Sequence, residues 1–167
     1  MKGGGSLKDA FSTLRQLFRS APRAVVEPEL IRTPVLLASS REDDAAALQE
    51  TFERSRWTSV VARDWSAALA AQEATNFPVV LCDRDLPGLS WKEGVRALMR
   101  TPRHPAIILL SDVADPYLWE ALIQAGGFEL LSRPLRRRET LGLVAFAHTH
   151  WKTDWPDRTP TRVGAIH

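Results

Sequence analysis

Several short apolar runs in this 167-residue chain end in side chains whose types could do chemistry together. Asp83 follows the run VVLC, Ser111 follows IILL, and Arg133 follows ELLS. A further run, VLLA, ends in Ser39 and Ser40. A carboxylate can act as a nucleophile, and a hydroxyl group and a cation beside it could offset the negative charge of a phosphoryl group. Whether these side chains meet depends on the elements that carry the runs.

From residue 34 onward, short apolar runs alternate with stretches of helical periodicity. This pattern is typical of βα units around a parallel sheet that is buried on both faces. The expected strands are 35–38, 59–62, 79–82, 106–110 and 129–131. The expected helices are 43–55, 66–75, 91–100, 116–125 and 138–150. Ligands of such sheets collect at the carboxyl ends of the strands, so we expect the polar residues at the ends of the runs to converge there.

The two ends of the chain differ from this pattern. Residues 1–33 are expected to form a basic amphipathic helix followed by a proline-containing linker. The apolar residues of this helix recur at helical spacing, and they are Leu7, Phe11, Leu14 and Phe18. We expect the helix to pack on the domain or to pair with a second copy, in preference to lying on an anionic membrane. Residues 34–151 would form the domain, and 152–167 a flexible tail.

Composition excludes several classes of protein. Hydrophobic residues make up 44% of the chain and charged residues 25%, as in soluble globular proteins. The net charge of +2 comes from dispersed basic residues, so nucleic acid is not the expected partner. No apolar run is long enough to span a membrane. Cys82 is the only cysteine, which excludes an internal disulfide and favours a cytoplasmic location. Alternation along the strand points it to the face opposite to Asp83, so we expect a buried structural thiol.

Over residues 34 to about 151 the chain resembles response-regulator receiver domains. The resemblance rests on three motifs in the order and spacing of that family: VVLCDRDLPG, IILLSD and GGFELLSRP. It implies an α/β, flavodoxin-like, doubly wound fold with five helices and a five-stranded parallel sheet in the order 2-1-3-4-5. It also implies that Asp83 is the phosphoacceptor and Ser111 the switch hydroxyl, and that Arg133 stands where the family usually has lysine.

The metal site that the resemblance implies is depleted. Receivers hold a divalent ion with an acidic pair after the first strand, and here Ser39 and Ser40 occupy those positions. Hydroxyl groups are poorer ligands than carboxylates for a hard cation. We therefore expect weak Mg²⁺ binding at most, through Asp83 with Asp85 as a weak further candidate.

Three acids follow the serines, namely Glu42, Asp43 and Asp44. They are expected in the first turn of a helix, where the helix dipole favours negative charge. Their main role is therefore expected to be stabilisation of the helix terminus. Glu42 as a substitute metal ligand is the minority interpretation.

Arginine in place of lysine changes the expected behaviour of the acceptor. The planar guanidinium of Arg133 can clamp a carboxylate in two places, so a direct ion pair with Asp83 is expected in the unmodified protein. The resemblance also implies a cis bond between Arg133 and Pro134. Receivers often carry a reporter aromatic residue on the fifth strand, but Leu130 holds that position here. A partner surface is expected on the fourth helix of the domain, around Tyr117 and Trp119, with Leu130 beside it.

Two functions are consistent with these features. The leading hypothesis is a phosphorelay receiver that takes a phosphoryl group on Asp83 from a histidine kinase or phosphotransfer protein. It would then bind an unidentified downstream protein, without an output domain and with no enzymatic activity beyond this self-catalysed transfer. The alternative is a pseudo-receiver that serves as a phosphorylation-independent interaction module, which the residues at positions 39, 40 and 133 favour. Pairing into a homodimer stays open in both.

Overall fold

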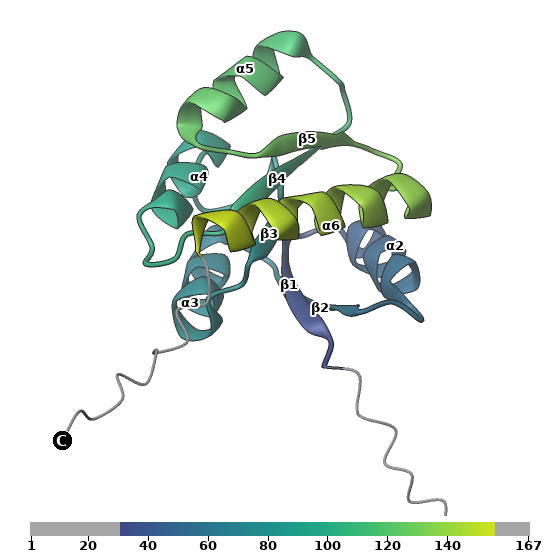
Figure 1. Ribbon diagram of the computed structural model, residues 1–167. Coiled ribbons are helices and arrows are strands. Elements are labelled where there is room, and N and C mark those ends of the chain that lie inside the picture. The colour runs from purple at the N-terminus through teal and green to yellow at the C-terminus, as the bar shows by residue number, and fades with distance from the viewer. Residues whose placement is uncertain (1–30, 156–167) are drawn as a thin grey trace, which may run out of the picture. The chain divides into compact units, whose positions relative to one another are not determined.

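The computed structural model describes residues 31–155, and it contains one parallel sheet with helices on both faces (Figure 1). The strands are β1 (Thr33–Ala38), β2 (Trp57–Ala62), β3 (Val79–Asp83), β4 (Ala106–Ser111) and β5 (Glu129–Ser132). The helices are α2 (Glu42–Phe52), α3 (Trp65–Thr75), α4 (Trp91–Met99), α5 (Pro116–Ala125) and α6 (Arg137–Asp154). The strand order is β2-β1-β3-β4-β5, which confirms the expected flavodoxin-like topology.

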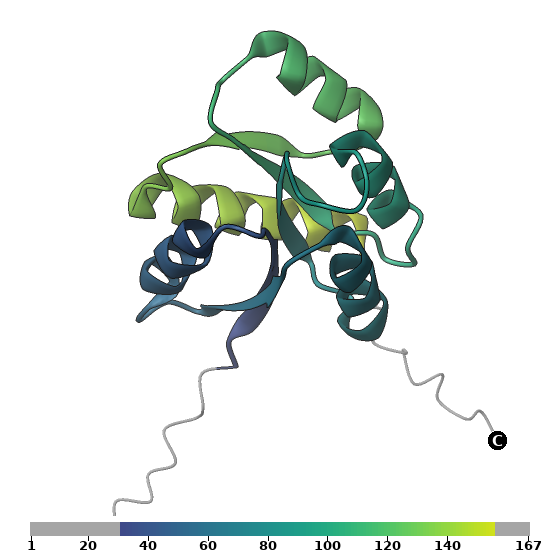
Figure 2. The same cartoon turned by 180° about the vertical axis from the view of Figure 1, so that it is seen from behind.

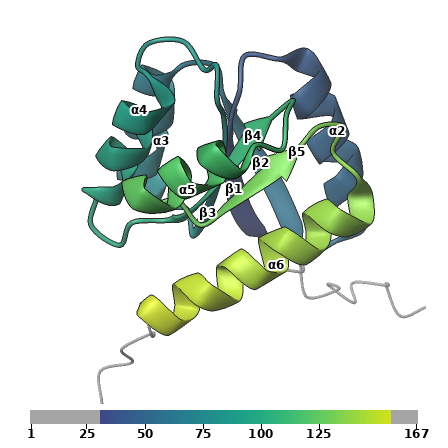
Figure 3. The same ribbon diagram turned by 90° about the horizontal axis from the view of Figure 1, so that it is seen from above.

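The sheet separates two apolar layers because alternate residues of each strand point to opposite faces. On one face, Val80 and Leu109 pack in a cluster with Trp65 of α3 and Leu122 of α5. On the other face, Leu81 packs with residues of α2 and α6. The views from behind and from above show α3, α4 and α5 on one side of the sheet and α2 and α6 on the other (Figures 2 and 3). The central strands are buried on both faces, which explains their continuous apolar runs.

Several element boundaries differ from the prediction for local reasons. Helix α2 ends at Phe52 rather than at residue 55, since Arg54 adopts a φ of 56° that a helix cannot contain. Strand β2 begins two residues early, because Trp57 pairs with Thr33 and is buried. Helix α6 continues to Asp154, so residues 152–154 are helical rather than part of the expected tail. The expected helix within residues 1–33 and the tail from 156 lie outside the described residues.

Cys82 lies in the buried layer against α3 to α5, on the face opposite to α2 and α6. Burial, together with the neighbouring charge of Asp83, raises the pKa of its thiol well above the ordinary value. This confirms the expectation of a buried structural thiol. Among the helices of residues 31–155, none has the length and apolar character that crossing a membrane requires.

Candidate functional site

The predicted polar residues converge at the carboxyl edge of the sheet. Asp83 and Ser111 are the last residues of β3 and β4, Ser39 follows β1, and all three are buried. Backbone hydrogen bonds tie the adjoining loops together: Arg84 N donates to Leu110 O at 3.0 Å, and Arg133 N donates to Ser111 O at 2.9 Å. The sheet therefore places a carboxylate, a hydroxyl group and a guanidinium at one edge, as the strand order requires.

Arg133 is the centre of this site. Its Nη2 lies 3.0 Å from Asp83 Oδ1, so the expected ion pair is present. The guanidinium also clamps Asp44 in two places, with Nε donating to Oδ1 at 2.8 Å and Nη2 donating to Oδ2 at 2.7 Å. All three side chains are almost fully buried. The peptide bond from Arg133 to Pro134 is cis, as the resemblance implied.

Asp44 is the site residue that the sequence interpretation missed. We expected it to stabilise a helix terminus, but it lies on the buried side of α2 with Leu48, Thr51 and Phe52. The spacing of 44, 48 and 51 on one helical face could have revealed this, because it puts Asp44 in line with core residues. A buried carboxylate requires a partner, and Arg133 is the partner that the fold supplies.

Ser39 supports Asp44 directly. Its hydroxyl donates to Asp44 Oδ2 at 2.7 Å and accepts a hydrogen bond from the backbone N–H of Arg41 at 3.1 Å. Ser40, the other residue at the acidic-pair positions, is exposed. Ser39 therefore orients the carboxylate that holds Arg133.

An exposed rim surrounds the buried ion pairs. Asp112 Oδ1 lies 3.1 Å from Arg41 Nη1 and 3.4 Å from Arg133 Nη1. The pair between Asp112 and Arg41 is solvent-exposed on both sides, and such pairs contribute at most about 1 kcal/mol, so it adds little to the stability of the site. Glu42 is also exposed, and its carboxylate pairs with Arg63 at 2.9 Å. Glu42 as a substitute ligand at the Asp83 site stays a minority interpretation, and in this structure its carboxylate is paired with Arg63.

The buried ion pairs determine the charge state of Asp44. Burial alone would raise the pKa of this carboxyl, but hydrogen bonds from Arg133 and Ser39 and the charges of Arg133 and Arg41 hold it below its ordinary value of 3.8. The hydrogen bond to Asp44 raises the pKa of Arg133, in opposition to its burial. Asp44 and Arg133 therefore stay charged over the physiological pH range.

This charge state predicts acid sensitivity. Because the folded pKa of Asp44 is lowered, the unfolded chain takes up its proton first. The stabilisation is fully present above the ordinary value of 3.8 and is lost as pH falls through the folded value. The free energy of unfolding can be measured by urea titration at a series of pH values. As the pH falls below about 3.8, we expect it to decline more steeply in the parent than in Asp44→Asn. Equal acid slopes in the two proteins would contradict this assignment.

The residues present do not fit a divalent metal ion. The acidic-pair positions carry hydroxyl groups, and one oxygen of Asp83 is already in an ion pair with Arg133 and accepts a hydrogen bond from the N–H of Asp85. The guanidinium provides a positive charge against both buried carboxylates, where a second cation would be repelled. In the part of the chain that the structure describes, no three His, Cys, Asp or Glu side chains are grouped to hold a metal.

The expected partner surface on α5 contains exposed aromatic side chains. Tyr117 is 82% exposed and Trp119 is 46% exposed. Trp119 Nε1 donates to Glu129 Oε1 at 2.8 Å, which lays the indole against β5, where Leu130 is half-buried. The alternative for Trp119, plain core packing, does not fit this exposure.

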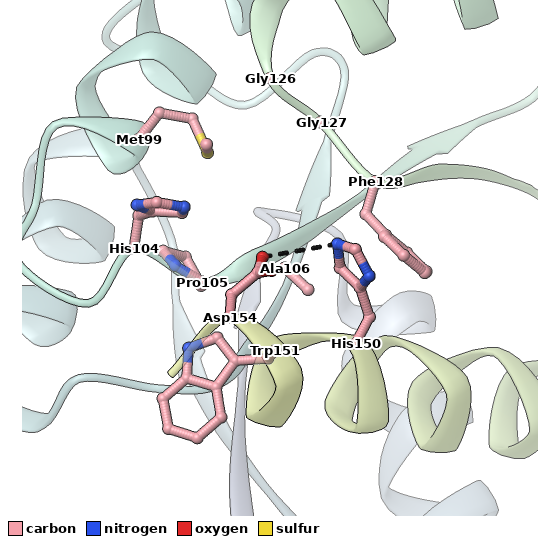
Figure 4. A pocket seen from close by; sticks show the side chains of 10 residues that line it. All are labelled: Met99, His104, Pro105, Ala106, Gly126, Gly127, Phe128, His150, Trp151 and Asp154. Carbon is pink, nitrogen blue, oxygen red and sulfur yellow. Dashed lines mark ion pairs between the residues drawn. The ribbon is translucent and has the colours of Figure 1, made fainter. Parts of the chain in front are cut away.

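A separate small pocket opens at the other end of the strands (Figure 4). It lies between the residues just before β4, the turn between α5 and β5, and the last turns of α6. Figure 4 shows Met99 and His104 on one side and Phe128 and His150 on the other. His150 Nε2 is 3.5 Å from Asp154 Oδ2. This pocket includes the first residue of β4, whereas Ser111 is the last, so it is distinct from the Asp83 site.

Comparisons with known proteins agree with the fold. The chain is 36% identical over 74 residues to the cyclic di-GMP phosphodiesterase response regulator RpfG of Xanthomonas campestris pv. campestris (strain 8004). That match covers 43% of this chain and 20% of the relative, so the aligned region spans about a fifth of the relative's length. No family model matches the chain.

Solved structures give the same result. The signal receiver domain of a LuxO repressor protein from Vibrio parahaemolyticus matches with a TM-score of 0.68 and 18% identity, over 74% of this chain and 95% of that one. The receiver domain of a sensor histidine kinase from Pseudomonas aeruginosa, with a magnesium ion in its active-site cleft, matches with a TM-score of 0.63 and 20% identity, over 71% and 98%. The resemblance to receiver domains is thus confirmed at the level of the fold.

Proposed function

We propose that this chain is a receiver-type signalling module that acts through protein interaction without accepting a phosphoryl group. The observation that carries the proposal is the Arg133 guanidinium between the carboxylates of Asp83 and Asp44. This cation neutralises the acceptor edge from within, which is the task that a metal ion performs in receivers that transfer phosphate. The site is therefore held in one charge state without an added ion.

The ion pair also opposes reaction at Asp83. One carboxylate oxygen is in an ion pair with Arg133 and accepts a hydrogen bond from the backbone of Asp85. A phosphoryl group arriving at this carboxylate would compete with Asp83 and Asp44 for the single positive charge of Arg133. These contacts favour the interaction module over the phosphoacceptor.

A phosphorelay receiver is the second candidate, and the positions of the predicted residues support it. Asp83 is buried at the end of β3, and Ser111 ends the adjacent strand β4. A histidine kinase or phosphotransfer protein would then be the donor. Mg²⁺ would have to bind weakly, with Asp83 as its main protein ligand.

One experiment separates the two candidates. The full chain is incubated with a small phosphodonor and Mg²⁺, and intact masses of the parent and Asp83→Asn are compared. We expect no phosphoryl adduct in either protein, because the acceptor stays in its ion pair with Arg133. An adduct present in the parent and lost in Asp83→Asn would overturn the proposal and establish the phosphoacceptor.

The interaction surface of this module is proposed to be α5 and the adjoining β5. Tyr117 and Trp119 expose large aromatic area, and such residues contribute strongly to protein interfaces. Leu130, the other residue expected at this surface, is half-buried on β5 and packs against the core cluster that includes Leu118 and Leu122 of α5. Once a binding protein is identified, Tyr117→Ala and Trp119→Ala are expected to weaken its affinity at least tenfold. Unchanged affinity in both variants would show that the α5 aromatic residues are not part of the interface.

A further inference from the structure

Strand β2 is an edge of the sheet with unpaired backbone groups on its outer side. Its only strand partner in the described residues is β1. The carbonyls of Arg56 and Ala62 accept hydrogen bonds from the backbone N–H groups of Thr33, the first residue of β1, and Ser39, which follows β1. The even-numbered residues of β2 therefore direct their backbone groups toward β1. Alternation then directs the N–H and C=O groups of Trp57, Ser59 and Val61 away from the sheet. Figure 1 shows β2 at the margin of the sheet, next to β1.

This edge lacks the features that usually prevent pairing with another chain. Natural edge strands are commonly protected by charged residues, proline or bulges. The sequence of β2 is WTSVVA, without charge or proline, and it keeps an unbroken register with β1. Val60 is 42% exposed and Val61 is 37% exposed, on opposite faces. An uncharged strand with exposed valines on both faces is suited to receive another strand.

A hollow lies beside the edge on the face covered by α2. It is about 580 Å³ in volume, and its lining combines small side chains, among them Ala45, Ala46 and Ser59, with charged ones at its margins, namely Arg32, Glu42, Glu53 and Arg63. Val61 also lies on this face, two residues from Ser59. An apolar side chain entering from outside could therefore fill space that the chain itself leaves open.

The charges around β2 are arranged for pairing in the antiparallel direction. Near the first residue of β2, the two positive charges of Arg32 and Arg56 exceed the one negative charge of Glu53. Near the last residue of β2, the two negative charges of Asp64 and Glu42 exceed the one positive charge of Arg63. Glu42 and Arg63 form an ion pair. One end of the strand is thus net basic and the other net acidic. Two copies in antiparallel orientation would bring unlike ends together, whereas parallel pairing would bring like ends together.

We propose that two copies of this chain pair through antiparallel β2 strands, with the two-fold axis passing at Val60. In this register, Ser59 of each copy faces Val61 of the other, and the outward backbone groups of both residues form the hydrogen bonds. Each Val61 then enters the hollow beside the other copy's Ser59. The two Val60 side chains meet across the axis, which covers the exposed valines on both faces. This pairing is independent of the Asp83 site.

The register can be tested by disulfide trapping. Residues at a non-hydrogen-bonded antiparallel position have Cα atoms about 4.5 Å apart, within reach of a disulfide, whereas diagonal neighbours two residues away are further apart. In full-length Val60→Cys we expect a disulfide-linked dimer under mild oxidation. Val61→Cys, on the same strand with nearly equal exposure, is the matched control and should cross-link at least tenfold more slowly. The native Cys82 is buried and should not interfere.

Each outcome bears on the proposal. Faster cross-linking of Val60→Cys supports the stated axis. Equal rates in the two variants, a faster rate for Val61→Cys, or no cross-linking of either would overturn it, the last result meaning that the edge is covered or unused in the full chain.

Sedimentation tests the association without added cysteine. The parent chain should show concentration-dependent dimerisation, and Val60→Lys should weaken the association constant at least tenfold, since it places two like charges on the axis. Val113→Lys, at an exposed valine outside β2, serves as the control and should dimerise as the parent does. A parent that stays monomeric, or a Val60→Lys variant that dimerises unchanged, would contradict the pairing. A complex with a different protein at this edge in place of dimerisation would also contradict it.

Discussion

Replacing Arg133 with methionine is expected to lower the free energy of unfolding by about 3–5 kcal/mol, because it leaves two buried carboxylates without their cation. Methionine preserves much of the length of the side chain, so the lost interaction is mainly electrostatic. Asp44 loses both hydrogen bonds of its clamp, and Asp83 loses its ion pair. Urea unfolding of the parent and the variant at neutral pH measures the difference.

Two further variants separate the buried charge from general effects of arginine removal. Arg138→Met removes an exposed arginine from the first turn of α6, and it should change the free energy by no more than about 0.5 kcal/mol. The double variant Arg133→Met with Asp44→Leu should recover part of the lost stability, since apolar side chains can replace a buried ion pair. A loss in Arg133→Met no larger than in Arg138→Met would contradict the role of the buried pair.

Restoring the acidic pair together with the lysine of ordinary receivers is expected to create magnesium binding. In the triple variant Ser39→Asp, Ser40→Asp and Arg133→Lys, two carboxylates are added at the metal positions and the guanidinium clamp is removed. Carboxylates are the ligands that hard cations prefer. We expect Mg²⁺ affinity to rise roughly a hundredfold over the parent, which corresponds to about 2.7 kcal/mol. Calorimetric titration with Mg²⁺ measures this change.

The matched control keeps Arg133. The double variant Ser39→Asp with Ser40→Asp adds the same carboxylates but leaves the guanidinium in place, so its gain in affinity should be much smaller than that of the triple variant. Equal gains in the two variants would show that the serines alone set the metal affinity. That result would show that Arg133 does not contribute to the weak Mg²⁺ affinity expected of the parent.

The sequence was sufficient for the sheet because the relevant signals are local and repeated. The runs that became β3 and β4 are apolar throughout, as expected of strands buried on both faces, and Gly126 ends α5 with a φ of 99°. The boundaries that differed depend on contacts between distant parts of the chain. Trp57 joined β2 because it pairs with Thr33, which the sequence around β2 does not indicate.

The site was predicted only in part for a similar reason. The pair between Asp83 and Arg133 followed from the motif order and from the geometry of the guanidinium group. Asp44 was missed because its neighbours Glu42 and Asp43 are exposed, and three consecutive acids at a helix start suggested a shared capping role. Only the packing of α2 against the sheet distinguishes the buried acid from the exposed ones. The sequence therefore indicated that Asp44 carries a negative charge, whereas its pairing with Arg133 became evident only from the fold.

The position of the Arg133 guanidinium between Asp83 and Asp44 can be observed directly by nitrogen-detected NMR of arginine side chains. Fixed hydrogen bonds slow rotation of the guanidinium amino groups, so we expect separate, slowly exchanging Nη–H signals for Arg133 in the parent. These signals should merge in Asp44→Asn, shift in Asp83→Asn, and stay unchanged on addition of Mg²⁺. Averaged signals in the parent that neither substitution alters would show that the guanidinium is not held by the two carboxylates.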